Sequence, residues 1–174
     1  ILNSGGENIK YLWDPFLKES AIGGLVGESE VGKSTFLVQL ALAIVRRDEE
    51  FLGHPLHIRH GRVLILSTED TEVAVCDYLR TIDNVPEEAL ANLHFLFEFE
   101  GRVETAIQES INRTGDVDLV IIDAYSDVAN TDINDLIKTR TLINEFRDIC
   151  RNNKCAMLLL HHFRKGDSNN GHSK

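Results

Sequence analysis

A stretch at residues 27–35 has the residue types that hold a phosphate chain. Its order, Gly-Glu-Ser-Glu-Val-Gly-Lys-Ser-Thr, fits the pattern G-x-x-x-x-G-K-[ST]. In such a loop the backbone N–H groups surround a phosphate, Lys33 reaches the β- and γ-phosphates, and the Ser34 hydroxyl ligates Mg²⁺. The sequence therefore predicts a nucleotide-binding loop made of Gly27, Glu28, Ser29, Glu30, Val31, Gly32, Lys33, Ser34 and Thr35.

The segments on either side of this loop are the ones that its chemistry needs. Residues 21–26 form an apolar run that predicts a buried strand, and residues 36–45 have the composition of a helix. This order places a phosphate at the N-terminus of the helix, where the partial positive charge of the helix dipole favours an anion.

A second apolar run ends in a carboxylate suited to a metal ion. Residues 118–123 contain four consecutive hydrophobic residues followed by Asp123. Many buried strands end in Asp, but after a complete phosphate-binding loop the pattern predicts that Asp123 holds the Mg²⁺ shell. Ser34 and Asp123 are therefore the predicted metal ligands.

Two further strands are predicted to bring polar side chains to the same place. Residues 63–67 are a continuous apolar run that leads to Glu69, and residues 155–160 lead to His161 and His162. Ligands in open α/β sheets bind at the carboxyl ends of the strands. These groups are therefore expected around the γ-phosphate.

The remaining periodicities complete an alternating pattern of helices and strands. Thr71 is expected to cap one helix, and another is expected to stop at Gly115. Around Trp13 we expect a packed N-terminal cap. The other predicted segments are a turn at 51–55, a helix at 86–93, a strand at 94–99, a polar loop at 124–133 and a helix that begins at Asp132 or Asn134.

Composition sets the class of protein. A chain of 174 residues with 43% hydrophobic residues is long enough for one domain with a sizeable core. No apolar run approaches the roughly 18 to 20 residues that span a bilayer, so we expect a soluble, cytoplasmic chain without a membrane partner. The formal net charge of −10 argues against a surface that grips nucleic acid by bulk electrostatics.

The cysteines and one histidine group are not predicted to form metal sites. Cys76, Cys150 and Cys155 lack metal-ligand spacing and are expected to be buried, reduced thiols. His54, His57 and His60 recur every three residues. They lie in a connecting segment without a nearby carboxylate or thiol, which disfavours a metal.

Four segments recur in this order in the RecA-like ATPases, and the chain resembles the RepA-type hexameric replicative helicases in particular. The segments are residues 27–35, 66–70, 119–123 and 160–165. The resemblance covers about residues 12–166. It implies an α/β fold with a mostly parallel sheet flanked by helices in three layers, as in RecA-like P-loop NTPases. Residues 1–166 would form this single ATP-binding domain, with further C-terminal strands apparently missing, and residues 167–174 a flexible loop or tail.

The resemblance also implies roles for individual residues. Glu69 matches the glutamate that polarises the attacking water, Asp123 the metal ligand, and His162 the sensor of the γ-phosphate. Arg80 matches a basic position near the nucleotide. The predicted catalytic residues are therefore Glu69, Lys33 and His162, with ATP and Mg²⁺ as cofactors.

The function implied is ATP hydrolysis by a motor domain that acts in DNA replication or recombination. Its partners would be DNA, single-stranded in preference, and copies of the same chain in a hexameric ring. Glu28 and Glu30 depart from the relatives and would weaken nucleotide binding, which leaves open a regulatory or scaffold module with little turnover. A small-molecule kinase is disfavoured because no Arg-rich lid segment is seen between the strands.

Overall fold

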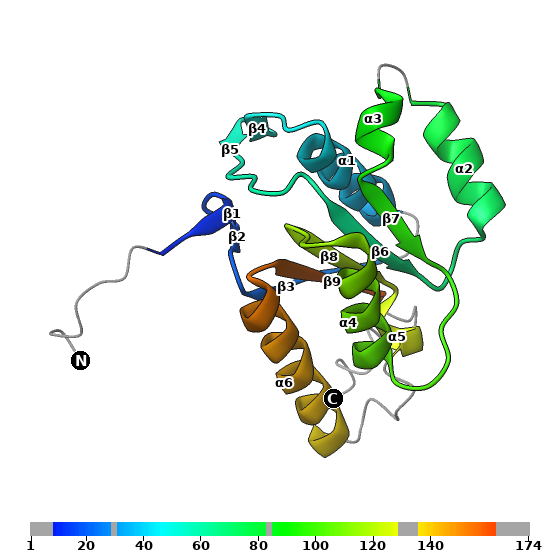
Figure 1. The fold of residues 1–174 in the computed structure, drawn as a ribbon. Coiled ribbons are helices and arrows are strands. Elements are labelled where there is room, and N and C mark those ends of the chain that lie inside the picture. Colours follow the sequence, from blue (N-terminus) through cyan, green and yellow to red (C-terminus); the bar gives the residue numbers. More distant parts are fainter. Residues whose placement is uncertain (1–8, 29–30, 83–84, 129–135, 163–174) are drawn as a thin grey trace, which may run out of the picture.

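A parallel β-sheet forms the centre of the molecule in the computed structural model, which describes residues 9–28, 31–82, 85–128 and 136–162 (Figure 1). Within these residues the sheet has five strands, and all neighbouring pairs are parallel. In spatial order the strands are β3 (Ile22–Gly27), β9 (Ala156–His162), β8 (Leu119–Asp123), β6 (Val63–Ser67) and β7 (Leu93–Leu96).

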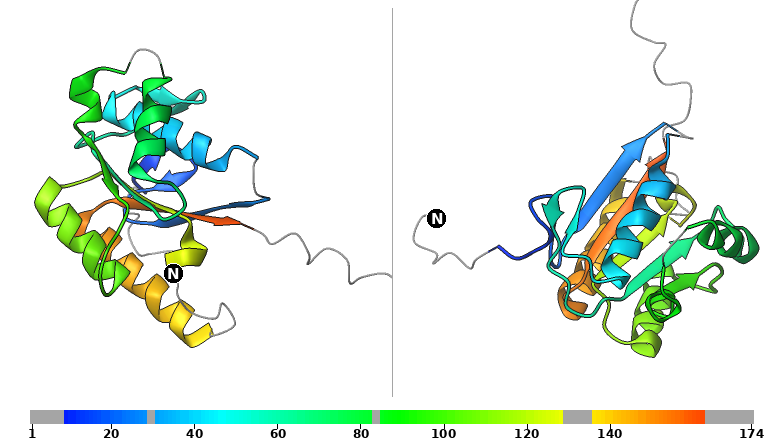
Figure 2. Two further views of the ribbon diagram at one scale, coloured as in Figure 1. Left: turned by 90° about the vertical axis from the view of Figure 1, so that its right-hand side faces the viewer. Right: turned by 90° about the horizontal axis from the view of Figure 1, so that it is seen from above.

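Helices cover both faces of the sheet, so the molecule has three layers (Figure 2). One face carries α1 (Lys33–Val45), α2 (Glu72–Arg80) and α3 (Glu87–Leu90), and the other carries α4 (Val103–Thr114), α5 (Tyr125–Val128) and α6 (Leu136–Asn153). This is the three-layer α/β architecture of a RecA-like P-loop NTPase, and the predicted fold class is confirmed.

The central strands are apolar throughout because both of their faces are covered. In β6, Val63 and Ile65 pack into the core on the α1 side, while Leu64 and Leu66 pack into the core on the α4 and α6 side. Successive side chains of a strand point to opposite faces, so a doubly covered strand is hydrophobic at every position. The short apolar runs in the sequence therefore marked the sheet correctly.

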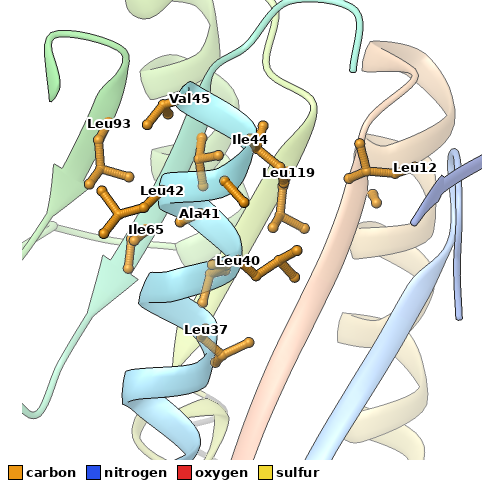
Figure 3. Packing of buried hydrophobic residues seen from close by; sticks show 14 of the residues in the cluster. Leu12, Leu37, Leu40, Ala41, Leu42, Ile44, Val45, Ile65, Leu93 and Leu119 are labelled. Atoms are coloured by element: carbon orange, nitrogen blue, oxygen red, sulfur yellow. The ribbon is translucent and has the colours of Figure 1, made fainter. Parts of the chain in front are cut away.

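Helix α1 joins the nucleotide-binding loop to the core. It follows Gly32, whose φ of 86° lies in the left-handed region that glycine adopts without a steric penalty. Leu37, Leu40, Ala41 and Ile44 recur at helical spacing and are all buried. Figure 3 shows this apolar stripe packed over Ile65, Leu93 and Leu119 of the sheet. The packing fixes the N-terminus of α1 at the edge of the sheet.

Two small hairpins precede and follow α1 and pack together. They are β1 (Tyr11–Trp13) with β2 (Leu17–Lys18), and β4 (Glu50–Phe51) with β5 (His54–Pro55). The indole Nε1 of Trp13 donates to the carbonyl oxygen of Phe51 at 3.1 Å, and its ring contacts Phe36 on α1. Trp13 is thus the predicted anchor, and the predicted turn at 51–55 lies within the second hairpin. The strands of both hairpins are too short for an alternating hydrophobic pattern to be recognised in the sequence.

Two predicted boundaries were wrong beside β7. The helix predicted at 86–93 ends at Leu90, and the strand predicted at 94–99 comprises Leu93–Leu96. Leu93 lies opposite Val63, and Leu96 lies opposite Leu66. These paired residues make up the whole of β7. The alternating aromatic residues continue beyond Leu96, so the sequence pattern alone does not show where the strand ends.

Three other predictions need correction or fall outside the described chain. The loop predicted at 124–133 contains helix α5, and its residues from 129 on, with the predicted starts of α6 at Asp132 and Asn134, lie outside the described residues. His161 and His162 belong to β9 itself rather than to a segment after it. Cys150 and Cys155 are buried free thiols as predicted, but Cys76 is exposed because it lies on the outer side of α2.

None of the helices in the described part of the chain is both long and apolar enough to cross a bilayer.

Candidate nucleotide site

The carboxyl ends of four strands meet at one edge of the sheet. Ser67 at the end of β6 lies opposite Asp123 at the end of β8. His162 at the end of β9 lies opposite Gly27, where β3 leads into the nucleotide-binding loop. The register therefore brings together all the strand ends that the sequence marked as functional.

Lys33 is held at the base of the loop. It is 7% exposed, although it carries a charge, and its ammonium donates to the carbonyl oxygen of Glu28. A buried ammonium requires partners, and a phosphate placed at the N-terminus of α1 would supply stronger ones than a carbonyl oxygen. The side chain of Glu28 is exposed and Val31 is 63% exposed, while Ser29 and Glu30 lie outside the described residues.

Thr68 ties the end of β6 to the end of β8. Its backbone N–H donates to the carbonyl oxygen of Asp123 at 2.8 Å, and its hydroxyl lies 3.3 Å from the same oxygen. The hydroxyl also accepts from the N–H of Ala124 at 3.1 Å. The Asp123–Ala124 peptide bond is cis. These bonds fix the backbone on both sides of the Asp123 carboxylate, which is 7% exposed.

A cavity of about 230 Å³ opens between the N-terminal part of α1 and α2, beside these strand ends. Its polar side contains the hydroxyls of Ser34 and Ser67 together with the carboxylates of Asp70 and Asp123. Its remaining walls are mostly apolar. The lining is completed by Thr35, Val38, Ile65, Ala74, Val75, Tyr78, Leu79 and Phe95.

The donor set at the polar side of the cavity suits Mg²⁺. Magnesium prefers oxygen ligands and is usually bound through one or two carboxylates together with substrate phosphates. Ser34 and Asp123 supply a hydroxyl and a carboxylate in one cavity, as the sequence predicted. Among the described residues, no group of three or more His, Cys, Asp or Glu side chains is arranged to hold a metal ion. The arrangement fits an ion that is completed by nucleotide oxygens.

Two other predicted residues, Glu69 and Arg80, do not line this cavity. Glu69 is exposed and does not line it, although Asp70, the next residue, does. Arg80 lies at the far end of α2, with its side chain 78% exposed and paired with Asp77 at 3.0 Å. His162 is placed by its strand position at the same sheet edge.

Sequence reasoning overlooked Tyr125, which follows Asp123 by two residues and begins α5. Its ring lies 6.4 Å from the ring of His161, centroid to centroid. Its hydroxyl is buried and has no hydrogen-bond partner among the described residues, and burial raises the pKa of this phenol. Tyr125 is therefore a protonated donor beside β9 at neutral pH. Its place immediately after the acidic strand end is a signal that could have identified it.

Comparison with known proteins places the chain in a family. No curated protein matches the sequence. A family model described as an AAA domain matches residues 2–168, which is nearly the whole chain. Together with the nucleotide-binding loop and the strand order, this match shows that the chain belongs to the AAA domain family of P-loop ATPases.

Proposed function

We propose that this domain binds MgATP at residues 27–35 and hydrolyses it as the motor domain of a RepA-type replicative helicase. The observation that carries the proposal is that Ser34 of the loop and Asp123 of β8 line one cavity beside the buried Lys33. P-loop ATPases use a hydroxyl and a carboxylate in these positions to orient the metal, and a lysine to stabilise charge on the phosphates.

The proposed chemistry assigns a separate task to each residue. Lys33 exchanges the carbonyl oxygen of Glu28 for phosphate oxygens, and Ser34 and Asp123 hold the metal. Bound Mg²⁺ neutralises charge on the β- and γ-phosphates. Glu69, in the exposed segment after β6, orients the attacking water, and His162 at the end of β9 senses the γ-phosphate.

The helicase assignment rests on the resemblance of four motifs that occur in the same order. If it holds, the partners of this domain are DNA and further copies of the chain in a ring. Subunits would complete each other's sites, which is typical of the group that the chain resembles. The net charge of −10 leads us to expect weak DNA binding per subunit that falls as salt is added.

A second candidate is a nucleotide-binding regulatory or scaffold module with little turnover. It is favoured by the contact between Lys33 and the carbonyl oxygen of Glu28, which a phosphate must displace, and by the carboxylates of Glu28 and Glu30 in the loop. Both features oppose the approach of a triphosphate. A module of this kind would bind the nucleotide measurably and hydrolyse it slowly or not at all.

Phosphate release separates the two candidates. We would measure steady-state hydrolysis of MgATP with and without single-stranded DNA, at low and high protein concentration, and nucleotide binding separately. Turnover that is stimulated by DNA and rises more than linearly with protein supports the assembling motor. Clear binding without turnover in every condition supports the module. The Lys33→Ala variant lacks the proposed phosphate-binding ammonium, so it gives the background level of phosphate release and of nucleotide binding.

A further inference from the structure

The chain places two adjacent acids, Glu69 and Asp70, after β6, and only one of them lines the cavity. Asp70 lines it together with Ser34, Ser67 and Asp123, whereas Glu69 does not. Both residues are exposed at the surface overall, so burial does not distinguish them. The distinction is that Asp70 alone of the pair contributes to the lining of the cavity.

Hydrogen bonds fix the chain on both sides of the pair. Thr68 is bonded to the carbonyl oxygen of Asp123 and to the N–H of Ala124. Thr71 caps α2, because its hydroxyl accepts from the N–H of Ala74 at 3.3 Å. Asp70 therefore lies between two hydrogen-bonded threonines, and it lines the cavity together with Ser34 and Asp123.

We propose that Asp70 is a second carboxylate of the metal site, which accepts hydrogen bonds from water in the Mg²⁺ shell. The inference rests on the proposed function of the same site and adds a residue to it. Magnesium keeps several of its waters when it binds to a protein, and these waters need acceptors on the protein side. Among the described residues that line the cavity, Asp70 and Asp123 are the two that have a carboxylate.

The proposal gives the two adjacent acids different tasks. Asp70 acts on metal affinity, while Glu69 acts on the attacking water and hence on turnover. The competing explanation is that Asp70 only complements the N-terminus of α2, where the helix dipole favours a negative charge. In that case its removal would lower stability slightly and leave the magnesium requirement unchanged.

The test is a magnesium titration of nucleotide binding. The full chain would be titrated with Mg²⁺ at a fixed concentration of a fluorescent ATP analogue, and Mn²⁺ binding in the presence of ATP would be followed by electron paramagnetic resonance. We would compare the parent with Asp70→Asn, Asp70→Glu, Glu69→Gln and Glu72→Gln. Glu72 is the matched control, because it is an exposed acid in the first turn of the same helix.

We expect Asp70→Asn to raise the Mg²⁺ concentration for half-maximal binding about tenfold, since residues that support metal ligands typically change metal affinity by 10-fold or more. Asp70→Glu keeps the negative charge and should retain most of the parental Mg²⁺ affinity. The Glu72→Gln and Glu69→Gln variants should need the same Mg²⁺ concentration for half-maximal binding as the parent. Parental Mg²⁺ and Mn²⁺ affinities in Asp70→Asn would overturn the proposal, as would an equal shift in Glu72→Gln.

Failure of the proposed function has a different signature. If the parent binds the nucleotide equally well with and without Mg²⁺ and releases no phosphate, the ATPase assignment fails and the role of Asp70 falls with it. If the parent is a magnesium-dependent ATPase and Asp70→Asn resembles it, only the role of Asp70 fails. Thermal unfolding of each variant verifies that the exposed substitutions leave the fold intact.

Discussion

Ser67 and Asp123 end adjacent parallel strands directly opposite each other, and both are buried. A hydroxyl and a carboxylate are thereby fixed side by side where the sheet stops. The strand ends are joined by Thr68, whose N–H and hydroxyl both contact the carbonyl oxygen of Asp123. The position of the proposed metal ligand thus depends on a residue that has no part in the chemistry itself.

Replacing Thr68 by Val should destabilise the domain and weaken magnesium-dependent nucleotide binding. The substitution keeps the shape but removes the acceptor for the N–H of Ala124, and a buried donor left without a partner costs about 1 to 3 kcal/mol. Urea unfolding would measure the stability. Thr81→Val is the control, because its hydroxyl bonds only the exposed end of α2, and its effect should stay below that of Thr68→Val.

Replacing Lys33 by Ala should remove most of the nucleotide affinity without loss of stability. The buried ammonium contributes to phosphate binding, but its hydrogen bond within the described residues is to a neutral carbonyl oxygen, so its removal relieves a desolvation cost. We expect at least a tenfold weaker nucleotide affinity, about 1.4 kcal/mol or more. Lys18→Ala, in the exposed position of β2, should behave like the parent. Parental affinity in Lys33→Ala would contradict the loop assignment.

Replacing Glu28 by Gln should tighten ATP binding by a few-fold. The substitution removes a negative charge next to the phosphates and leaves the backbone carbonyl that contacts Lys33 in place. The effect should shrink as salt is added, because the side chain is exposed. Calorimetric titration at two ionic strengths would measure it. Glu49→Gln, also exposed, provides the control, and a weaker affinity in Glu28→Gln would count against charge repulsion.

The stability of the domain should fall as the pH drops below the ordinary pKa of histidine, near 6.5, because of His94. Burial, with a smaller contribution from the charge of Arg62, lowers the pKa of this side chain in the folded state. The unfolded chain therefore binds the proton more tightly, so acidification favours unfolding. In addition, the Nε2 atom is buried and has no hydrogen-bond partner among the described residues.

His94→Phe should flatten this dependence, which unfolding by urea between pH 5 and 7.5 would measure. The exposed His57→Gln is the matched control and should retain the parental slope. Equal slopes in all three proteins would show that His94 titrates normally in the folded state.

The sequence was sufficient to predict the central sheet and the meeting of Ser34 and Asp123 at one edge of it, because both depend on local patterns. A doubly covered strand is apolar at each position, as in β6 and β8, and a nucleotide-binding loop has a fixed spacing of Gly32, Lys33 and Ser34. The register of parallel strands then brings Asp123 to the loop without any information beyond the strand order.

The remaining features depend on contacts that no local pattern encodes. Glu69 and Asp70 are chemically alike in the sequence, but only Asp70 of the two lines the cavity, in a segment held at Thr68 and Thr71. Likewise, the bounds of β7 are those of its pairing with β6, from Leu93 opposite Val63 to Leu96 opposite Leu66, and this pairing is not encoded by a local pattern. Cys76 is exposed because it lies on the outer side of α2, whereas Val75 and Tyr78 of the same helix line the cavity.

Helix α2 has a further consequence for how the site opens. Residues Glu72–Arg80 contain no buried side chain, and Val73 is 70% exposed, so little apolar area holds this helix against the sheet. Local opening is least costly where few apolar contacts must be broken. Its amide hydrogens should accordingly exchange with solvent far faster than those of the buried α1. Helix α2, which forms one wall of the cavity, would then separate from the sheet without global unfolding. Solvent and ions could reach Asp123 from this side rather than through the nucleotide-binding loop.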